Sequence, residues 1–236
     1  MLIQQGKARS SDADRHLACS LAGMAGALNT AGFYAVGLYS SNMTGNVSAL
    51  ADHLGVRDLA VAALYLTLVA TFVSGAIVST LLINVGRRRR LAGIYAVSLL
   101  LEALLLAALG CADLWVSEVQ RGPALAFGLS FLMGLQNAVV TRISNARVRT
   151  THVTGMVTDI GIELGNLIDL AGRRGHEEEV VFNKDNLRLH SQTVASFLVG
   201  GIVGVVVYKA IGAYLLFGVS VLLLLLSGRY ILAAHR

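Results

Sequence analysis

Charged residues, proline and cysteine are all scarce in this sequence. Charged residues make up 14% of the 236-residue chain, whereas soluble domains carry about 25%. The sequence also has no hydrolase nucleophile motif, phosphate-binding loop or dinucleotide fingerprint, so we do not expect an enzyme. Cys19 and Cys111 stand alone, without the spacing of a metal site or a disulfide framework. We therefore expect neither a metal site nor a cofactor.

In place of charge, the chain has long apolar runs and 25 glycines. Hydrophobic residues make up 55% of it, and the mean hydropathy is +0.67. A run of about 20 apolar residues is long enough to cross the hydrocarbon core of a bilayer. The sequence therefore predicts an all-α integral membrane protein with six transmembrane helices. The expected spans are 17–39, 59–84, 91–110, 123–141, 189–207 and 210–228.

The lysines and arginines orient these six spans. With the turn Arg87–Arg90 placed in the cytoplasm, 16 of the 19 basic residues fall on the cytoplasmic side. The three that remain outside are Arg57, Arg121 and Lys209. By the positive-inside rule, this distribution predicts that both termini are cytoplasmic. A patch that binds nucleic acid or anionic lipid is the less favoured interpretation of the arginine run.

Two stretches of the chain resemble each other at a nearly constant spacing. Thr44, Gly45, Val47, Leu54 and Gly55 recur 110 positions later as Thr154, Gly155, Val157, Leu164 and Gly165. Further matches pair Gly26 and Asn29 with Gly134 and Asn137, Phe72 and Gly75 with Phe197 and Gly200, and Gly93 and Tyr95 with Gly212 and Tyr214. We interpret the chain as a three-span unit written twice, although low complexity among apolar helices is the alternative. Because three is odd, the second copy would be inverted, as in many secondary transporters.

This duplication divides the chain into expected parts. They are a cytoplasmic tail (1–16), a first three-span repeat (17–111), an external loop (112–122), and a second repeat (123–232) that contains a cytoplasmic loop (142–188). Within the repeats, the segments 44–55 and 154–165 are too short to span a membrane. We interpret each as a half-helix capped by its threonine, Thr44 or Thr154.

The start of a half-helix can form a binding site. Its unpaired N–H groups carry partial positive charge, which favours an anionic or carbonyl-bearing ligand. Gly45 and Gly155 would let a ligand approach the backbone closely. The alternative is an ordinary interfacial loop that leads into a capped surface helix.

Polar side chains within the apolar spans complete the predicted substrate site. Asn29 and Asn137 occupy the first span of each half, Gln136 precedes Asn137, and Asn46 follows Gly45. An amide in lipid must be paired, so these residues either bind solute or tie helices together. The predicted substrate-binding residues are Asn29, Thr44, Gly45, Asn46, Gln136, Asn137, Thr154 and Gly155.

Three carboxylates are candidates for proton or ion coupling. Glu102 lies near the middle of the third span, where a carboxyl is a functional candidate by default. It would either stay protonated or pair with a residue such as Arg142. Asp159 and Glu163 lie four residues apart and share a face of the second half-helix. Acid–base chemistry, cation binding and surface ion pairing with nearby arginines are all open for this pair.

The motifs resemble those of a known family. Gly134-Leu135-Gln136-Asn137-Ala138, Thr150-Thr151-His152-Val153-Thr154-Gly155 and Ser41-Asn42-Met43-Thr44-Gly45-Asn46 are similar to the signature of the YoaK-like family of bacterial integral membrane proteins. The resemblance covers about residues 17–232 and implies a six-span inner-membrane protein without an assigned activity. The family usually has Asp at the position of Asn29 and more often Asn at that of Met156. If that Asp carries a proton or cation in relatives, this chain lacks that coupling.

These observations lead to one expected function and one alternative. We expect a small-solute transporter or permease, embedded in a lipid bilayer, that takes a small or anionic solute at the two Thr-Gly starts. The alternative is a non-transporting scaffold or sensor that acts through the mixed-charge run 172–186. No nucleic-acid partner is expected, and the oligomeric state is left open.

Overall fold

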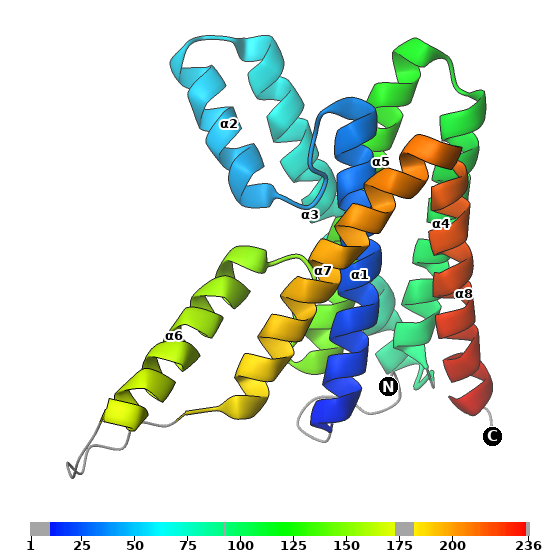
Figure 1. Cartoon of the computed structure of the whole chain (residues 1–236). Helices are drawn as coiled ribbons and strands as arrows, with labels where there is room; N and C mark the ends of the chain where they lie inside the picture. Colours follow the sequence, from blue (N-terminus) through cyan, green and yellow to red (C-terminus); the bar gives the residue numbers. More distant parts are fainter. Residues whose placement is uncertain (1–9, 92, 173–181, 235–236) are drawn as a thin grey trace.

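The fold is known from a computed structural model, which describes residues 10–91, 93–172 and 182–234. All regular elements in these ranges are α-helices. The eight helices are α1 (Ser11–Val36), α2 (Met43–Gly55), α3 (Leu59–Arg88), α4 (Ile94–Trp115), α5 (Glu118–Ser144), α6 (Val153–Gly172), α7 (Lys184–Ile211) and α8 (Tyr214–Ala234). The start of α1 and the end of α8 lie at the same end of the bundle (Figure 1). The α4–α5 and α7–α8 turns lie at the opposite end.

Four of the described helices are long and apolar enough to cross a membrane. They are α3, α4, α5 and α7. The two other expected spans are helical, but α1 does not reach the same apolar character and the apolar part of α8, Tyr214–Arg229, is shorter. The all-α prediction is thus confirmed, together with four of the candidate spans. The count of six spans stays a prediction.

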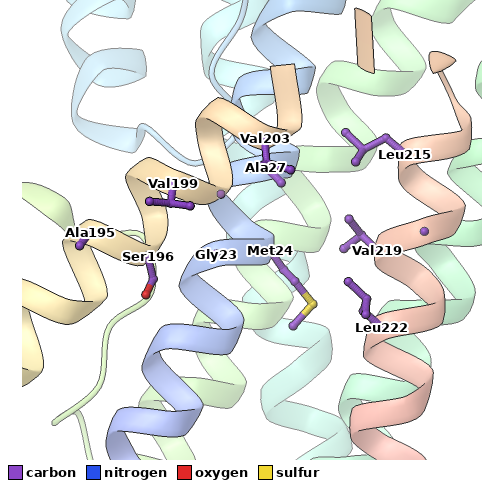
Figure 2. A pocket seen from close by; sticks show the side chains of 12 residues that line it. Gly23, Met24, Ala27, Ala195, Ser196, Val199, Val203, Leu215, Val219 and Leu222 are labelled. Atoms are coloured by element: carbon purple, nitrogen blue, oxygen red, sulfur yellow. The ribbon is translucent and has the colours of Figure 1, made fainter. Parts of the chain in front are cut away.

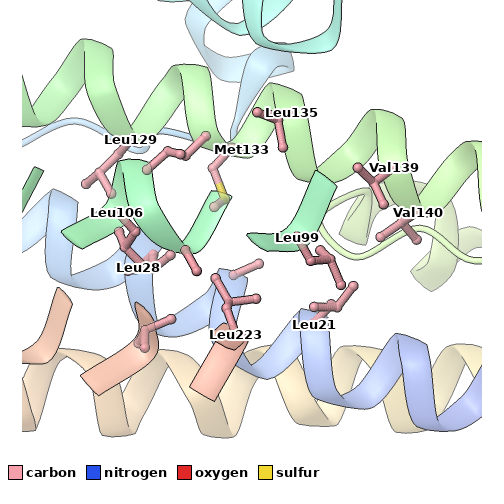
Figure 3. Packing of buried hydrophobic residues seen from close by; sticks show 14 of the residues in the cluster. Leu21, Leu28, Leu99, Leu106, Leu129, Met133, Leu135, Val139, Val140 and Leu223 are labelled. Atoms are coloured by element: carbon pink, nitrogen blue, oxygen red, sulfur yellow. The ribbon is translucent and has the colours of Figure 1, made fainter. Parts of the chain in front are cut away.

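Helices of one half pack mainly against helices of the other half. The most extensive contacts join α1 to α7, α3 to α5 and α4 to α8. The apolar core lies where α1, α4, α5 and α8 meet, with leucines from all four helices (Figure 3). Examples are Leu28, Leu106, Leu129 and Leu223, each no more than 1% exposed. The two halves therefore share one core.

Glycines bring two of these helix pairs into backbone contact. A Cβ atom on Gly26 of α1 would collide with the carbonyl oxygen of Phe197 in α7. A Cβ atom on Gly134 of α5 would collide in the same way with the carbonyl oxygen of Phe72 in α3. Gly26 matches Gly134 in the sequence repeat, and Phe72 matches Phe197. The matched residues thus lie at two similar helix crossings.

The helix bounds differ from the expected ones where polar residues begin a helix. Helix α1 starts at Ser11, so the end of the expected tail 1–16 is helical, because Ser10 accepts from the Ala13 N–H and caps the helix. The expected external loop 112–122 is mostly helix, since α4 runs to Trp115 and α5 begins at Glu118. The expected loop 142–188 holds all of α6 and the first turn of α7. The mixed-charge run 172–186 lies mostly outside the described residues.

Candidate functional site

A central cavity lies where the starts of α2 and α6 meet the middles of the long helices. Its volume is about 470 Å³. The residues that line it are Asn29, Tyr39, Ser41, Asn42, Met43, Thr44, Phe72, Asn137, Thr151, His152, Val153, Thr154 and Phe197. In Figure 1, α2 and α6 lie on the same flank of the bundle, α2 towards the upper end and α6 towards the lower. The cavity therefore joins the two segments that the sequence marks as duplicated.

The lining of this cavity is almost entirely made of matched pairs. Asn29 corresponds to Asn137 at a spacing of 108, and Phe72 to Phe197 at 125. The other four pairs, at a spacing of 110, are Ser41 with Thr151, Asn42 with His152, Met43 with Val153 and Thr44 with Thr154. Twelve of the thirteen lining residues thus belong to six pairs, and Tyr39 is the exception. Each half contributes the same six positions to one cavity.

Hydrogen bonds to two equivalent asparagines hold the segments that lead into α2 and α6. The Asn29 Oδ1 atom accepts from the Ser41 backbone N–H at 3.0 Å and from the Ser41 hydroxyl at 2.9 Å. The Asn137 Oδ1 atom accepts from the Thr151 hydroxyl at 3.0 Å. Both asparagines therefore tie a long helix to the half-helix segment of the same half. They also line the cavity, so the two roles that the sequence left open coincide.

The predicted threonine caps are wrong. Helix α2 begins one residue before Thr44, and Asn42 is its cap, with its Oδ1 atom accepting from the Gly45 N–H at 3.1 Å. Helix α6 begins at Val153, so Thr154 also lies inside its helix. Both threonines line the cavity instead. Helix α6 also extends to Gly172, well beyond the predicted end at 165.

The two glycines make room for the side chain that precedes each helix. A Cβ atom on Gly45 would collide with the Asn42 amide, and one on Gly155 with the His152 ring. Neither glycine lines the cavity, and neither does Asn46, whose amide donates to the Tyr39 carbonyl at 3.4 Å. Of the eight predicted substrate residues, the cavity therefore holds Asn29, Thr44, Asn137 and Thr154. The binding role of all eight stays a prediction.

Gln136 and Glu102 form a buried pair behind the cavity. Both side chains are fully buried, and the Gln136 Nε2 atom donates to the Glu102 Oε1 atom at 2.9 Å. The Gln136 Oε1 atom accepts from the Thr150 hydroxyl at 3.4 Å. The second carboxyl oxygen of Glu102, Oε2, is buried without a hydrogen-bond partner. The hydrogen-bond partner of Glu102 is therefore Gln136, and the predicted pairing with Arg142 is not formed.

Asp159 and Glu163 contact the segment that leads into α7 and its first turns. The Asp159 carboxylate lies 3.7 Å from the Nδ1 atom of His190, and Glu163 accepts from the Asn183 backbone N–H at 2.8 Å. Ion pairing with the nearby arginines was one of the three roles that the sequence left open for this pair. Asp159 and His190 also line a polar cavity of about 310 Å³, together with Arg147 and Arg149. His152 lines both this polar cavity and the central one.

Two other cavities have a different character. The first, of about 590 Å³, lies among α1, α7 and α8 and is almost wholly apolar, with Met24, Val199 and Leu222 around it (Figure 2). The second, of about 620 Å³, lies beside Arg121 and Tyr208. Both of these side chains bind the buried Asp113 carboxylate, so their polar groups are already paired. The central cavity is therefore the candidate solute site.

Sequence reasoning missed several lining residues. Phe72 and Phe197 were recognised as a repeated pair but not as part of a site, because an aromatic residue on an apolar helix usually belongs to a core. Ser41, Thr151 and His152 lie within the quoted motifs, and their shared spacing of 110 was the available signal. A search for every equivalent pair with a polar member would have included them. Tyr39 has no such signal, since its counterpart is Arg149.

Comparison with known proteins agrees with the motif resemblance. The UPF0700 transmembrane protein YoaK of Bacillus subtilis (strain 168) is 24% identical over 181 residues, which are 76% of this chain and 77% of that protein. No solved structure matches the chain. The family described as "Protein of unknown function (DUF1275)" matches residues 17–228. Together with its apolar helices, these matches identify the chain as a membrane protein that belongs to the DUF1275 family.

Proposed function

We propose that this protein is a small-solute transporter of the bacterial inner membrane, with its binding site in the central cavity. One observation carries the proposal: twelve of the thirteen lining residues are contributed as six equivalent pairs by the two halves. A cavity shared equally by two repeats is the arrangement in which secondary transporters bind their solutes. We further propose that the two halves are inverted repeats of three spans, with both termini in the cytoplasm.

The lining favours an uncharged polar solute. None of the thirteen lining residues is Asp, Glu, Lys or Arg. A cationic solute in a cavity between membrane helices would need a carboxylate beside it, because the surrounding protein and lipid solvate ions poorly. An anion would find only the partial positive charges at the starts of α2 and α6. The amides of Asn29, Asn42 and Asn137 and the hydroxyls of Thr44 and Thr154 suit carbonyl and hydroxyl groups instead. Phe72 and Phe197 offer apolar ring faces to the body of the solute.

A ligand screen on the purified protein tests this proposal. A solute that binds only the folded state raises the melting temperature, by the equivalent of about 2.7 kcal/mol at a concentration 100 times its Kd. The panel contains uncharged polar metabolites, with anions for comparison. We expect an uncharged hit whose thermal shift is lost in Thr44→Ala and in Thr154→Ala.

The repeat also supplies matched controls. Ser48 and Thr158 lie one turn further along α2 and α6, are exposed, and do not line the cavity. Ser48→Ala and Thr158→Ala should therefore keep the thermal shift. The hit should then enter proteoliposomes that contain the protein and fail to enter when either cavity threonine is changed. A solute whose thermal shift is unchanged in both Thr44→Ala and Thr154→Ala would contradict the transporter proposal. So would a solute that binds but is not taken up.

A further inference from the structure

A buried chain of hydrogen bonds connects the interior of the bundle to the central cavity. It consists of Glu102 in α4, Gln136 in α5 and Thr150 before α6, and we call these three residues the polar arm. All three side chains are fully buried. The neighbour of Thr150 is Thr151, which lines the cavity and donates to Asn137. The polar arm therefore ends at the segment that forms one wall of the candidate solute site.

The polar arm has no second copy at the equivalent positions of the repeat. Glu102 comes from the first half, and Gln136 and Thr150 come from the second. The positions that match these three in the opposite halves, at spacings of 119, 108 and 110, are Val221, Leu28 and Ser40. The Ser40 hydroxyl is buried without a hydrogen-bond partner. The first half nevertheless forms the same tie to its half-helix segment, through Asn29 and Ser41. The fold of such a segment therefore does not require the arm, and the arm adds something that only the α6 side has.

The carboxyl group of Glu102 is incompletely satisfied. Its Oε1 atom accepts from Gln136, whereas its Oε2 atom has no partner. A carboxylate buried in this way needs further donors, because an unpaired charge inside a bundle is very costly. A metal cation would need several oxygen ligands, but the group that faces Oε1 is an N–H donor. A proton on Oε2 is the chemically simplest way to neutralise Glu102.

No other charged group in the described residues pairs with Glu102. Among residues whose side chains the structure describes, the titratable and charged groups on the helices around it are Asp12, Asp14, Arg15, His16, Cys19 and Tyr34 on α1, Tyr65, Arg87 and Arg88 on α3, Tyr95, Cys111 and Asp113 on α4, Glu118, Arg121 and Arg142 on α5, and Tyr214 and Arg229 on α8. Several of these have partners elsewhere: Asp14 pairs with Arg147, Arg87 binds the Tyr95 hydroxyl, and Asp113 binds Arg121. A change in the protonation of Glu102 therefore acts on the rest of the protein mainly through its hydrogen bond with Gln136.

We infer that Glu102 is a proton-binding positioning residue that controls the α6 side of the central cavity. When a proton occupies Oε2, the arm keeps its hydrogen bonds and holds Thr150 and Thr151 in place. When the proton leaves, the remaining carboxylate attracts additional hydrogen-bond donors. The donors within the arm are the Gln136 amide and the Thr150 hydroxyl. Moving the Thr150 hydroxyl away from Gln136 shifts Thr151 and the start of α6. This inference rests on the proposed function, since it assigns proton control to the same cavity.

Distances between spin labels test the inference without a known solute. In a protein whose Cys19 and Cys111 are replaced by Ala, one label is placed at Trp115→Cys, at the exposed end of α4. The second label is placed at Ile168→Cys on α6 or, as the reference, at Val56→Cys beyond α2; all three sites are more than 70% exposed. We expect the α6 distance to shift when the pH is changed and the α2 distance to stay constant.

Variants of the polar arm separate proton control from simple packing. Glu102→Gln keeps the size of the side chain but cannot titrate, so it should abolish the pH-dependent shift. Thr150→Val breaks the arm while retaining Glu102 and should also abolish it, which keeps the test decisive if Glu102→Gln does not fold. Ser40→Ala, the matched change in the first half, and Ser98→Ala, a buried change one turn from Glu102, should retain the shift.

The outcomes are distinguishable from those of the solute screen. An α6 distance that does not respond to pH, or one that still responds in both Glu102→Gln and Thr150→Val, would overturn the inference. A pH response that depends on both residues, combined with a failed solute screen, would leave proton control intact and remove the transporter proposal. A solute that binds the cavity, in a protein whose α6 distance does not respond to pH, would support the transporter proposal and overturn proton control by Glu102.

Discussion

At the scale of single residues, the structure separates two roles that the sequence had merged. Thr44 and Thr154 were expected to cap their helices, but Asn42 caps α2 and both threonines face the cavity. The cap could not be chosen from the sequence alone, because Asn and Thr both favour this position and lie two residues apart. A helix start is commonly uncertain by one or two residues. The cavity threonines are consequently free to contact a ligand.

This assignment predicts different stability effects for neighbouring substitutions. Asn42→Ala removes the acceptor for the Gly45 N–H, so it should lower the free energy of unfolding by about 1 kcal/mol. Thr44→Ala should leave the stability nearly unchanged, because its hydroxyl does not cap the helix. Melting temperatures of the two variants in the same detergent would check this prediction. Equal losses in both would restore Thr44 as the cap.

At the scale of helices, the crossings of α1 with α7 and of α3 with α5 depend on glycine. Ala at Gly26 or at Gly134 would meet a backbone carbonyl, which cannot move aside like a side chain. We expect each change to destabilise the protein by about 1–3 kcal/mol, as overpacking does elsewhere. Similar losses from both changes are expected because the crossings are equivalent. Melting temperatures again provide the measurement.

Gly161 provides the matched comparison for these crossings. It lies inside α6, and nothing approaches the place of its Cβ atom within 4 Å. Gly161→Ala should therefore stabilise the helix by about 0.5–1 kcal/mol through its better helix propensity. If Gly26→Ala and Gly161→Ala raised the melting temperature alike, close contact between α1 and α7 would be refuted.

The tether of α6 to the start of α7 gives a further prediction. Glu163 accepts from the Asn183 N–H and Asp159 lies beside His190. Such exposed contacts contribute only about 0–1 kcal/mol to the stability of the whole protein. Replacing both residues by alanine should therefore leave the melting temperature nearly unchanged but speed hydrogen exchange in α6. The rates in α2 serve as the internal control, and unchanged exchange in α6 would show that these contacts do not hold it.

Much of this arrangement could be predicted from the sequence, and the physical reasons for the rest are specific. Apolar runs identified the long helices because hydrocarbon admits few charges, and the spacing of Thr-Gly pairs identified α2 and α6. The length of α6 was underestimated because the matched residues of the repeat end at Gly165, whereas the helix continues to Gly172. The cavity could not be predicted, because the sequence does not show that α1 packs against α7 rather than against the helices next to it in the chain.

At the scale of the whole molecule, the placement of the helix ends predicts which residues are accessible from each side of the membrane. Trp115 and Val119 lie at the α4–α5 turn and are more than 80% exposed, whereas Leu91 lies at the α3–α4 turn beside the arginine run. In intact cells, a membrane-impermeant thiol reagent should label Cys at 115 or 119 and spare Cys at 91. Permeabilised cells should label all three. Labelling of position 91 in intact cells would reverse the proposed orientation.

The cross-half packing also constrains how the protein can be made. Since the main contacts of α1, α3 and α4 are with α7, α5 and α8, the first half has few contacts of its own when it leaves the ribosome, chiefly those of α2 with α3. Its helices must remain in the bilayer as loosely associated segments, with their glycine surfaces uncovered, until the second half arrives. Folding is therefore delayed to the end of synthesis. A premature stop after α4 would leave a fragment that the cell's membrane proteases can recognise, rather than a smaller working unit.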